Sequence, residues 1–440
     1  MPSRLLSLVL VCLFAATAPG FDGPQQPDDS AAGFRNRAGD TAWMLTSTAF
    51  VLMMTIPGLA LFYGGLVRTK NVLSVLMQCL AAVGLVSLQW FLVGYSLAFS
   101  EGRWFGGFDW LLLNGVDADG ATPHGYADRI PHQLWMIYQL MFAIITPALI
   151  CGAFAERVKF SGLALFLVLW STFVYDPLAH WVWGAGGMLR NADKNPWGAL
   201  DFAGGTVVHV SSGISALVCA LYLGKRRGYL KEPMPPHNMT STFVGASLLW
   251  IGWFGFNAGS ALEANATAVS AFCNTHFATA AAAISWSLAE WFARGKASAL
   301  GAVSGAVAGL VAITPACGFV TIQASVLIGL AAGVVCFIAC TTVKNAFKYD
   351  DSLDAFGIHG AGGMLGALLT GVFATTVNDL GRGRQIVNQL LAIGAATLIA
   401  AVGTLLLLVI VDKTVGMRVK DSEEIEGLDL TQHGEAGYHL

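Results

Sequence analysis

The sequence predicts an all-α polytopic membrane protein with eleven transmembrane helices. Of its 440 residues, 55% are hydrophobic and only 12% are charged, whereas a soluble domain carries about 25% charged residues. Apolar runs of about 20 residues, the length that crosses a bilayer, recur along the chain. The 51 glycines suit helices that pack closely in lipid. The net charge of -3 gives no reason to expect a nucleic-acid partner.

Residues 1–20 have the pattern of a signal peptide. Arg4 precedes the apolar run LLSLVLVCLFAATA, and small residues follow as far as Gly20. The alternative is an extra membrane helix, but the apolar run is short for a span. Residues 21–41, rich in polar residues, proline and glycine, are expected to form an external N-terminal tail.

A transmembrane domain is predicted over residues 42–411, followed by a cytoplasmic tail over 412–440. Apolar runs place the eleven spans near 42–66, 71–99, 133–155, 161–183, 203–224, 240–259, 267–292, 298–314, 320–343, 354–376 and 386–411.

The distribution of Lys and Arg predicts the orientation. With the N-terminus outside, the cytoplasmic segments hold fifteen of the 24 Lys and Arg residues and the outer segments hold eight. Lys and Arg concentrate in cytoplasmic loops of membrane proteins. The chain is therefore expected in the plasma (inner) membrane, with its N-terminus outside and its C-terminus in the cytoplasm.

Spans 5 and 10 share a pattern that indicates an internal duplication. An aspartate precedes a histidine in both, as Asp201 and His209, and as Asp354 and His359. Spans 1–5 and 6–10 then form an inverted repeat, to which the eleventh helix is added, because each half has an odd number of spans. At ~1.5 Å per residue, each histidine lies roughly 8–12 Å inside its span, so the two imidazoles can meet.

Of the nine histidines, His209 and His359 are the two placed well inside predicted spans. His180 and His276 lie in or near spans, whereas His124, His132, His237, His433 and His439 are assigned to loops or tails. The plainest interpretation of a histidine in a span is a packing group with satisfied hydrogen bonds. An ionisable side chain in lipid otherwise faces a partner or a pathway.

A histidine pair inside a membrane has three candidate functions. A metal site needs further ligands, but Asp201 and Asp354 stand at helix starts, where capping of free N–H groups is the expected role, so no metal or cofactor is predicted. A nucleophilic enzyme is a second alternative, although no Ser/His/Asp spacing is diagnostic. A narrow pore is the third, because neutral imidazoles offer polar atoms to a small solute while apolar walls exclude hydrated ions.

Aromatic residues near the outer ends of spans 3, 4 and 6 suggest a cation site. These are Phe142, Trp183, Trp253 and Phe256, with Ser260 close by. A cation over aromatic faces gains roughly 0.5–2 kcal/mol, and a serine hydroxyl adds an acceptor. The alternative is an aromatic belt at the membrane interface.

Several long motifs resemble those of the ammonium transporter family (Amt/Mep/Rh), especially its bacterial Amt branch. The resemblance extends over about residues 41–438. It is carried by TIPGLALFYGGLVRTKNVLS (55–74), GAFAERVKFSG (152–162), DFAGGTVVH (201–209), GWFGFNAGS (252–260), TPACGFV (314–320) and DAFGIHGAGG (354–363).

The resemblance implies a homotrimer that transports ammonium or ammonia, is not an enzyme, and has one pore in each subunit. It gives Phe142, Trp183 and Ser260 as the external ammonium site, and Phe142 with Phe256 as a gate. His209 and His359 resemble the family's twin histidines in the pore. Asp201 resembles its structural aspartate, while Trp253 and Thr314 match further positions in the pore or vestibule.

The C-terminal stretch EGLDLTQHGEAGY (426–438) resembles the tails through which Amt proteins are regulated by cytoplasmic PII-type proteins. A solvated acidic tail is the simpler alternative. Two other functions remain open on the same fold: an ammonium sensor that acts through a cytoplasmic partner, and an Rh-like ammonia or carbon dioxide channel. The long outer loop at 100–132 has no assigned function.

Overall fold

The computed structural model describes residues 37–191, 195–377 and 381–438. The predicted signal peptide lies outside these residues. Within them, every regular element longer than an isolated bridge is a helix.

The first five membrane segments are built from helices that follow one another within each span. Span 1 is α2 (Ala38–Met53), η1 (Met54–Leu59) and α3 (Ala60–Leu66), and span 2 is α4 (Val72–Gln89), η3 (Trp90–Gly94) and α5 (Tyr95–Phe99). Span 3 is α6 (His132–Phe154), span 4 is α7 (Phe160–Trp170), η6 (Ser171–Tyr175) and α8 (Asp176–Trp183), and span 5 is η7 (Gly205–Val210) with α9 (Ser211–Leu223).

The second six segments are α10 (Met239–Gly259); α11 (Ala266–Arg294); α12 (Ala299–Ile313); α13 (Ile322–Ile338), η8 (Ala339–Val343) and α14 (Lys344–Phe347); η9 (Phe356–Gly360) with α15 (Ala361–Phe373); and α16 (Gly381–Thr414). Short 3₁₀ turns are η2 (Thr69–Asn71), η4 (Leu111–Leu113) and η5 (Pro123–Gly125), and the tail holds α17 (Asp421–Glu426) and α18 (Leu428–His433).

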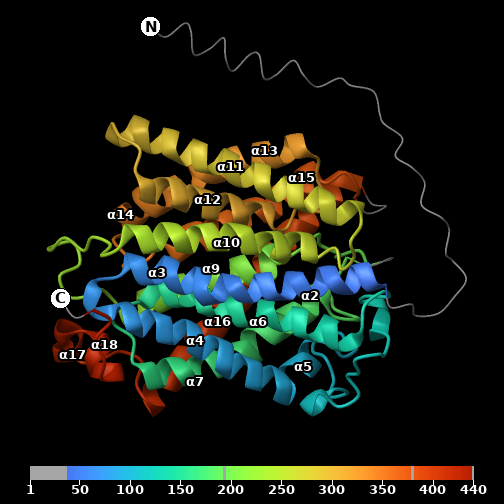
Figure 1. Cartoon of the computed structure of the whole chain (residues 1–440), viewed down its shortest axis with the longest axis horizontal. Coiled ribbons are helices and arrows are strands. Elements are labelled where there is room, and N and C mark those ends of the chain that lie inside the picture. Colours follow the sequence, from blue (N-terminus) through green and yellow to red (C-terminus); the bar gives the residue numbers. More distant parts are fainter. Residues whose placement is uncertain (1–36, 192–194, 378–380, 439–440) are drawn as a thin grey trace, which may run out of the picture. The chain divides into compact units, whose positions relative to one another are not determined.

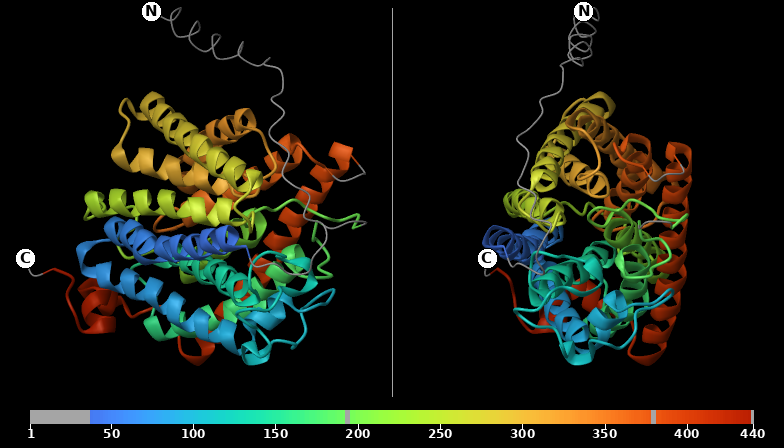
Figure 2. Two further views of the ribbon diagram at one scale, coloured as in Figure 1. Left: turned by 45° about the vertical axis from the view of Figure 1, so that its right-hand side comes forward. Right: turned by 90° about the vertical axis from the view of Figure 1, so that its right-hand side faces the viewer.

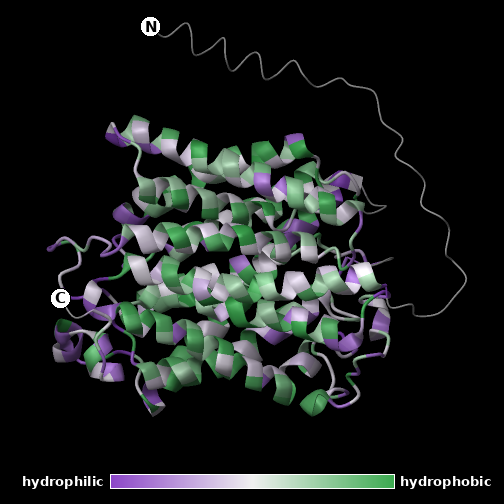
Figure 3. Ribbon diagram, viewed as in Figure 1, coloured by the Kyte–Doolittle hydropathy of each residue, from purple (hydrophilic) through white to green (hydrophobic). Residues whose placement is uncertain are grey.

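Nine segments of the described chain are long and apolar enough to cross a membrane. Two further segments complete the predicted eleven: α12 is shorter, and α11 has 29 residues but is less apolar. The predicted boundaries agree with the helices to within a few residues. The helices run side by side in Figure 1, and polar residues gather at the two ends of the bundle in Figure 3. Figure 2 shows α16 as a long helix along one edge.

The helices of spans 5 and 10 cross closely because glycines face each other there. A Cβ added at Gly213 would lie 2.1 Å from the backbone nitrogen of Gly360, and one at Gly363 would lie 2.9 Å from the Cβ of His209. Any larger side chain at either position would push the two helices apart. Both helices begin with a π-helical turn, η7 and η9, and each turn contains the histidine of its span.

A buried ion-pair network joins the loops at one end of the bundle. Arg226 lies 2.9 Å from Glu156 and 2.8 Å from Asp350, and Arg68 lies 3.0 Å from Glu156. Burial alone would raise the pKa of Glu156, but the charges of Arg226 and Arg68 outweigh it and hold that pKa below its usual range. The pKa of Asp350 is lowered in the same way, with Arg226 overcoming the effect of burial.

The C-terminal tail packs on the same end through α17 and α18. The Asp429 carboxylate accepts a hydrogen bond of 2.8 Å from the Ser74 backbone N–H, and the Leu428 N–H donates to the Asn71 side chain at 2.8 Å. Glu424 accepts from the Arg227 N–H at 2.6 Å. The tail is therefore attached to the loops that follow spans 1 and 5 and to the first turn of α4, and it is not merely a solvated acidic segment.

Candidate functional site

His209 and His359 meet in the interior of the bundle. Their Nδ1 atoms lie 3.3 Å apart, and their rings are inclined by 21° with centroids 5.3 Å apart. The two residues are 1% and 4% exposed. Two facing imidazole nitrogens form a hydrogen bond only if one donates and the other accepts. The prediction that the two imidazoles meet is confirmed, at a separation that lets one Nδ1 donate to the other.

Asp201 holds the start of the helix that carries His209. Its carboxylate accepts backbone N–H bonds from Gly204 (2.8 Å), Gly205 (2.6 Å), Thr206 (2.8 Å) and Val207 (3.3 Å), and the Thr206 hydroxyl also donates to it. Burial raises the pKa of Asp201, and the hydrogen bonds from Thr206 and Gly204 oppose that change. The predicted capping role of Asp201 is confirmed.

The equivalent cap on the second helix is Asp351, not Asp354, so that prediction was wrong. Asp351 accepts from the N–H groups of Ala355 (3.1 Å) and Phe356 (2.8 Å). Asp354 has φ of 60°, and its carboxylate pairs with Lys344 at 2.6 Å. Its backbone conformation and its cation partner thus give Asp354 a different role. The corrected cap restores the repeat, since each carboxylate now stands eight residues before its histidine.

The histidines line a narrow apolar lumen. Its other walls are Met54, Leu59, Phe62, Ile145, Leu149, Val208, Leu249, Trp253, Phe256 and Val307. The cavity is about 10 Å³, close to the ~10–15 Å³ that admits one water molecule. Nε2 of His209 is buried without a hydrogen-bond partner among the described residues. The lumen fits a solute of about the size of water, with an imidazole nitrogen available to bind it.

Two phenylalanine rings separate this lumen from a second cavity. Phe142 and Phe256 have ring centroids 4.3 Å apart and planes inclined by 34°. Phe142 lines the second cavity, and Phe256 lines the lumen. The stacked rings therefore stand where the two spaces adjoin, with one ring lining each space.

The second cavity, here called the vestibule, encloses about 240 Å³. Phe142, Trp183 and Ser260 line it together, and the Trp183 and Phe142 rings stand at 84° with centroids 5.9 Å apart. Trp183 Nε1 donates to the Asp201 carbonyl at 3.0 Å, which fixes the indole. Ser260 Oγ lies 2.8 Å from the Phe256 carbonyl and donates its hydrogen there, so its lone pairs remain as acceptors.

Trp253 and Thr314 act as a pair, and only one of them lines the lumen. The Trp253 ring lies 5.4 Å from the His209 ring, inclined by 23°. Its Nε1 donates to Thr314 Oγ1 at 2.8 Å. Thr314 is fully buried and lines neither cavity. It therefore fixes the orientation of Trp253 and does not contact a solute.

Sequence reasoning missed two polar residues near the site and placed a histidine outside its helix. Gln139 lines the vestibule, and its Oε1 is buried without a partner among the described residues. The Tyr138 hydroxyl lies 3.2 Å from Ser260 Oγ. His132, assigned to a loop, is the first residue of α6 and lies 2.5 Å from the Tyr95 hydroxyl. Pro131 before it is a helix-start signal that could have placed it.

The described residues contain no group of three or more His, Cys, Asp or Glu side chains placed to hold a metal ion. The fold and these two cavities define a class: a polytopic membrane protein with an aromatic vestibule that leads to a histidine-lined lumen. The family model of the Ammonium Transporter Family matches residues 42–438. The chain belongs to that family.

Known proteins are similar over most of their length. An ammonium transporter of Bacillus subtilis is 49% identical over 409 residues, which cover 91% of this chain and 98% of the relative. The crystal structure of Candida albicans Mep2 is 35% identical with a TM-score of 0.82, covering 91% of this chain and 90% of the other. A structure described as a sensor Amt protein is 27% identical with a TM-score of 0.82, covering 90% and 98%.

Proposed function

We propose that this protein takes up ammonium across the membrane, by capturing the cation in the vestibule and conducting it through the histidine-lined lumen. The observation that carries the proposal is the order of the parts. A cavity with aromatic faces and a serine acceptor ends at a phenylalanine pair, and the imidazoles lie on the other side of that pair. The family membership and the relatives named as ammonium transporters support it.

The vestibule suits a cation. The faces of Phe142 and Trp183 attract a positive charge, and each such contact is worth roughly 0.5–2 kcal/mol. Ser260 offers an acceptor for one of the four N–H groups of ammonium. Na⁺ holds its water more tightly than ammonium does, so these weak contacts do not repay its dehydration.

The lumen suits the neutral molecule. Apart from the two histidines, the ten residues that line it have apolar or aromatic side chains. An unpaired charge in the lumen therefore loses several kcal/mol of hydration free energy. Ammonium that releases its proton avoids this cost, and His209 or His359 then binds ammonia by a hydrogen bond. K⁺ has no proton to release, so the same step excludes it.

The surroundings of the pore carry further proposals. The chain lies in the plasma (inner) membrane with the vestibule outside and the docked tail in the cytoplasm, because Lys and Arg are concentrated at the tail end. The functional unit is a homotrimer with one pore in each subunit. A PII-type regulatory protein acts through the tail, which contacts loops of the transmembrane domain.

The test is ammonium-evoked current in proteoliposomes on solid-supported membranes. We compare wild type with the double variant His209→Ala/His359→Ala. His276→Ala is the matched control, because His276 is exposed on α11 and lines neither cavity. Loss of current, or a new K⁺ current, in the double variant alone supports the proposal.

Rapid internal alkalinisation without current in wild type would instead indicate passive ammonia conduction, as in an Rh-like channel. Absence of current and of any pH change, in protein that is well folded, would overturn the transport proposal. It would favour an ammonium sensor, in keeping with the similarity to the sensor Amt protein.

A further inference from the structure

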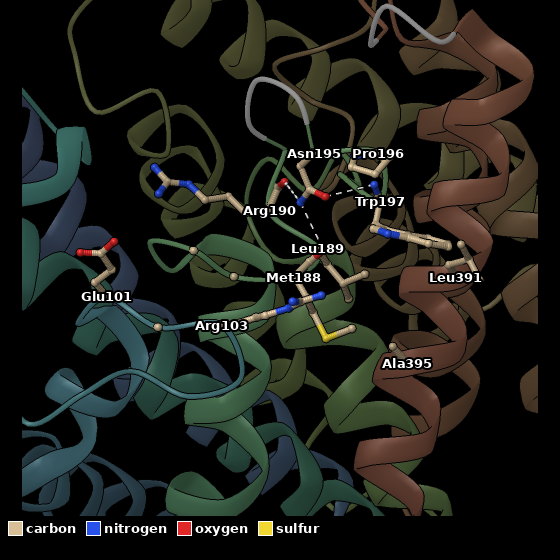
Figure 4. A pocket seen from close by; sticks show the side chains of 13 residues that line it. Glu101, Arg103, Met188, Leu189, Arg190, Asn195, Pro196, Trp197, Leu391 and Ala395 are labelled. Carbon is tan, nitrogen blue, oxygen red and sulfur yellow. Dashed lines mark hydrogen bonds between the residues drawn. The ribbon is translucent and has the colours of Figure 1, made fainter.

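A third cavity, here called the side cavity, shares one residue with the vestibule. It encloses about 960 Å³ between the loop after α5, the loop after α8 and the long helix α16, and Figure 4 shows the residues that line it. Among the described residues that line either cavity, Arg190 alone lines both. In Figure 4 the Arg190 side chain points away from Trp197 and Leu391. The charged end of Arg190 therefore belongs to the vestibule side.

The backbone around Arg190 is held by hydrogen bonds within its own loop. The Asn195 side chain donates to the Arg190 carbonyl at 2.8 Å, and to the Met188 carbonyl at 3.2 Å (Figure 4). The Arg190 N–H donates to the Gly187 carbonyl at 3.2 Å, and an isolated bridge pairs Arg190 with Ala199. The loop thus fixes the point from which the guanidinium reaches the vestibule wall.

The guanidinium of Arg190 covers the open face of Tyr126. Its central carbon lies 5.1 Å from the centre of the Tyr126 ring. Trp135 stacks on the same ring, with centroids 5.2 Å apart and planes inclined by 9°. A ring has two faces, so the indole takes one and the guanidinium the other. Tyr126 lines the vestibule, and an aromatic face attracts a cation. Arg190 therefore occupies a face that ammonium would otherwise use.

Tyr126 is fixed in place and uncharged. Its hydroxyl donates to the Phe99 carbonyl at 2.8 Å and accepts from the Ala185 N–H at 2.5 Å. Burial raises the pKa of Tyr126 to about 12, so the ring is a neutral phenol at physiological pH. Arg190 and Tyr126 therefore form a cation–π contact and not an ion pair, and the positive charge of Arg190 is not cancelled by its partner.

No other group near Arg190 cancels its charge. Neither a hydrogen bond nor an ion pair joins its guanidinium to another described residue. Among the described residues that line the vestibule, Asp201 is the one with a carboxylate. That carboxylate is engaged by the N–H groups at the start of the His209 helix. Arg190 thus adds a positive charge to the wall of the cavity in which ammonium is proposed to bind.

We propose that Arg190 is a specificity-determining residue of the vestibule: its fixed charge repels entering cations and sets the ammonium concentration at which the site fills. The inference rests on the proposed capture of ammonium by Phe142, Trp183 and Ser260. Because Arg190 takes the face of Tyr126, ammonium is confined to that site, beside the phenylalanine pair. A repulsive potential of about one kT lowers the local concentration of a monovalent cation about threefold and that of a divalent cation about sevenfold. The charge therefore disfavours divalent cations most.

The test is an ammonium titration of the intact protein in detergent, in which ammonium chloride replaces sodium chloride at constant ionic strength. Binding is read as the rise in the unfolding midpoint. At about 10 mM ionic strength, Arg190→Gln should be half-saturated at about one third of the ammonium concentration that wild type needs. Arg190→Glu should lower that concentration further, and Arg190→Lys should resemble wild type. Arg103→Gln is the matched control, since the Arg103 guanidinium also lies over a ring, that of Trp104 at 5.9 Å, and Arg103 lines only the side cavity.

Salt separates the effect of a charge from that of packing. The Debye length falls from about 30 Å at 10 mM to about 3 Å at 1 M ionic strength. Wild type should therefore be half-saturated at a lower ammonium concentration in high salt, a measurement that needs no variant. The difference between wild type and Arg190→Gln should disappear there. Midpoints without ammonium check that each variant is folded.

Three results would count against the inference, and each has a separate meaning. Equal half-saturation of wild type and Arg190→Gln in low salt would overturn it. Weaker binding in both the Gln and the Glu variant at every salt concentration would also overturn it, because that is the result of lost packing. No ammonium-dependent rise in wild type would overturn capture in the vestibule and this inference with it. Binding in detergent needs no transport, so a missing current alone would count against the transport proposal only.

Discussion

Replacing Asp201 by asparagine removes the carboxylate that organises the start of the His209 helix. One carboxylate oxygen receives Gly204 and Gly205, and the other receives the Thr206 N–H, the Thr206 hydroxyl and the Val207 N–H. The asparagine oxygen can keep the first pair. Its NH₂ group then faces the backbone N–H groups of Thr206 and Val207 and leaves both without an acceptor, while the Thr206 hydroxyl can turn and accept from it.

The expected loss follows from that count. At about 1 kcal/mol for each of the two backbone hydrogen bonds removed, Asp201→Asn should lower the free energy of unfolding by about 2 kcal/mol. That is a large part of the ~5–15 kcal/mol that stabilises a typical protein. Trp183 should also loosen, because its Nε1 donates to the Asp201 carbonyl. Both the midpoint of thermal unfolding in detergent and the ammonium current in proteoliposomes should therefore fall.

The two measurements together make this reasoning refutable. Thr206→Val is a matched control, because it removes only the hydroxyl bond and should cost about 1 kcal/mol. If Asp201→Asn lost its current while its unfolding midpoint equalled that of wild type, the carboxylate would act on the solute by its charge. The capping explanation would then fail. An unchanged midpoint and an unchanged current would show that the five hydrogen bonds contribute little.

Three further predictions concern other parts of the molecule. Gln139→Leu should weaken ammonium binding several-fold, with maximal current unchanged, because the amide lines the vestibule but not the lumen; an altered maximal current with unchanged affinity would contradict this. Glu156 and Asp350 have lowered pKa values in the folded protein. Their ionised forms therefore stabilise the fold at any pH above about 4.3, the ordinary pKa of a glutamate. This contribution to stability is lost as the pH falls further, through the lowered pKa values. Unfolding midpoints measured from pH 7 to 3 should therefore drop on the acid side, and Arg226→Gln should lower the midpoint at pH 7 while flattening that drop; parallel curves would refute the assignment. Asp429→Ala should release the tail, because it removes the hydrogen bond from the Ser74 N–H and weakens the attachment of the tail by about 1–3 kcal/mol. Trypsin should then cleave faster after Lys420. An unchanged cleavage rate would show that other contacts hold the tail.

The parts of the fold that the sequence predicted are those with strong physical constraints. A bilayer requires long apolar segments, so the spans were found to within a few residues. His209 and His359 were recognised because an imidazole in lipid needs a partner, and the aspartate–histidine order repeated in spans 5 and 10 indicated that the two histidines pair. Phe142, Trp183, Ser260 and Phe256 were singled out as a possible cation site from their place near the outer ends of spans, and the family resemblance gave them their roles. The structure brings them together around the two cavities.

The features that the sequence did not predict depend on contacts between distant segments. Asp351 and Asp354 are three residues apart, and only the backbone conformation and Lys344 decide which one caps the helix. Gln139 differs from an ordinary packing residue only by its place on the vestibule wall. The cavity between the loop after α5, the loop after α8 and α16 is lined by segments that are far apart in the sequence, so no local pattern marks it.

The equal spacing of the two caps has a consequence for sequence variation. Asp201 and Asp351 fix where each helix starts, and eight residues later the imidazole points into the lumen. One residue added or removed between cap and histidine would turn the ring by about 100° around the helix axis, away from its partner. The length of these two stretches is therefore fixed, so natural and engineered variants should differ in length in the loops instead.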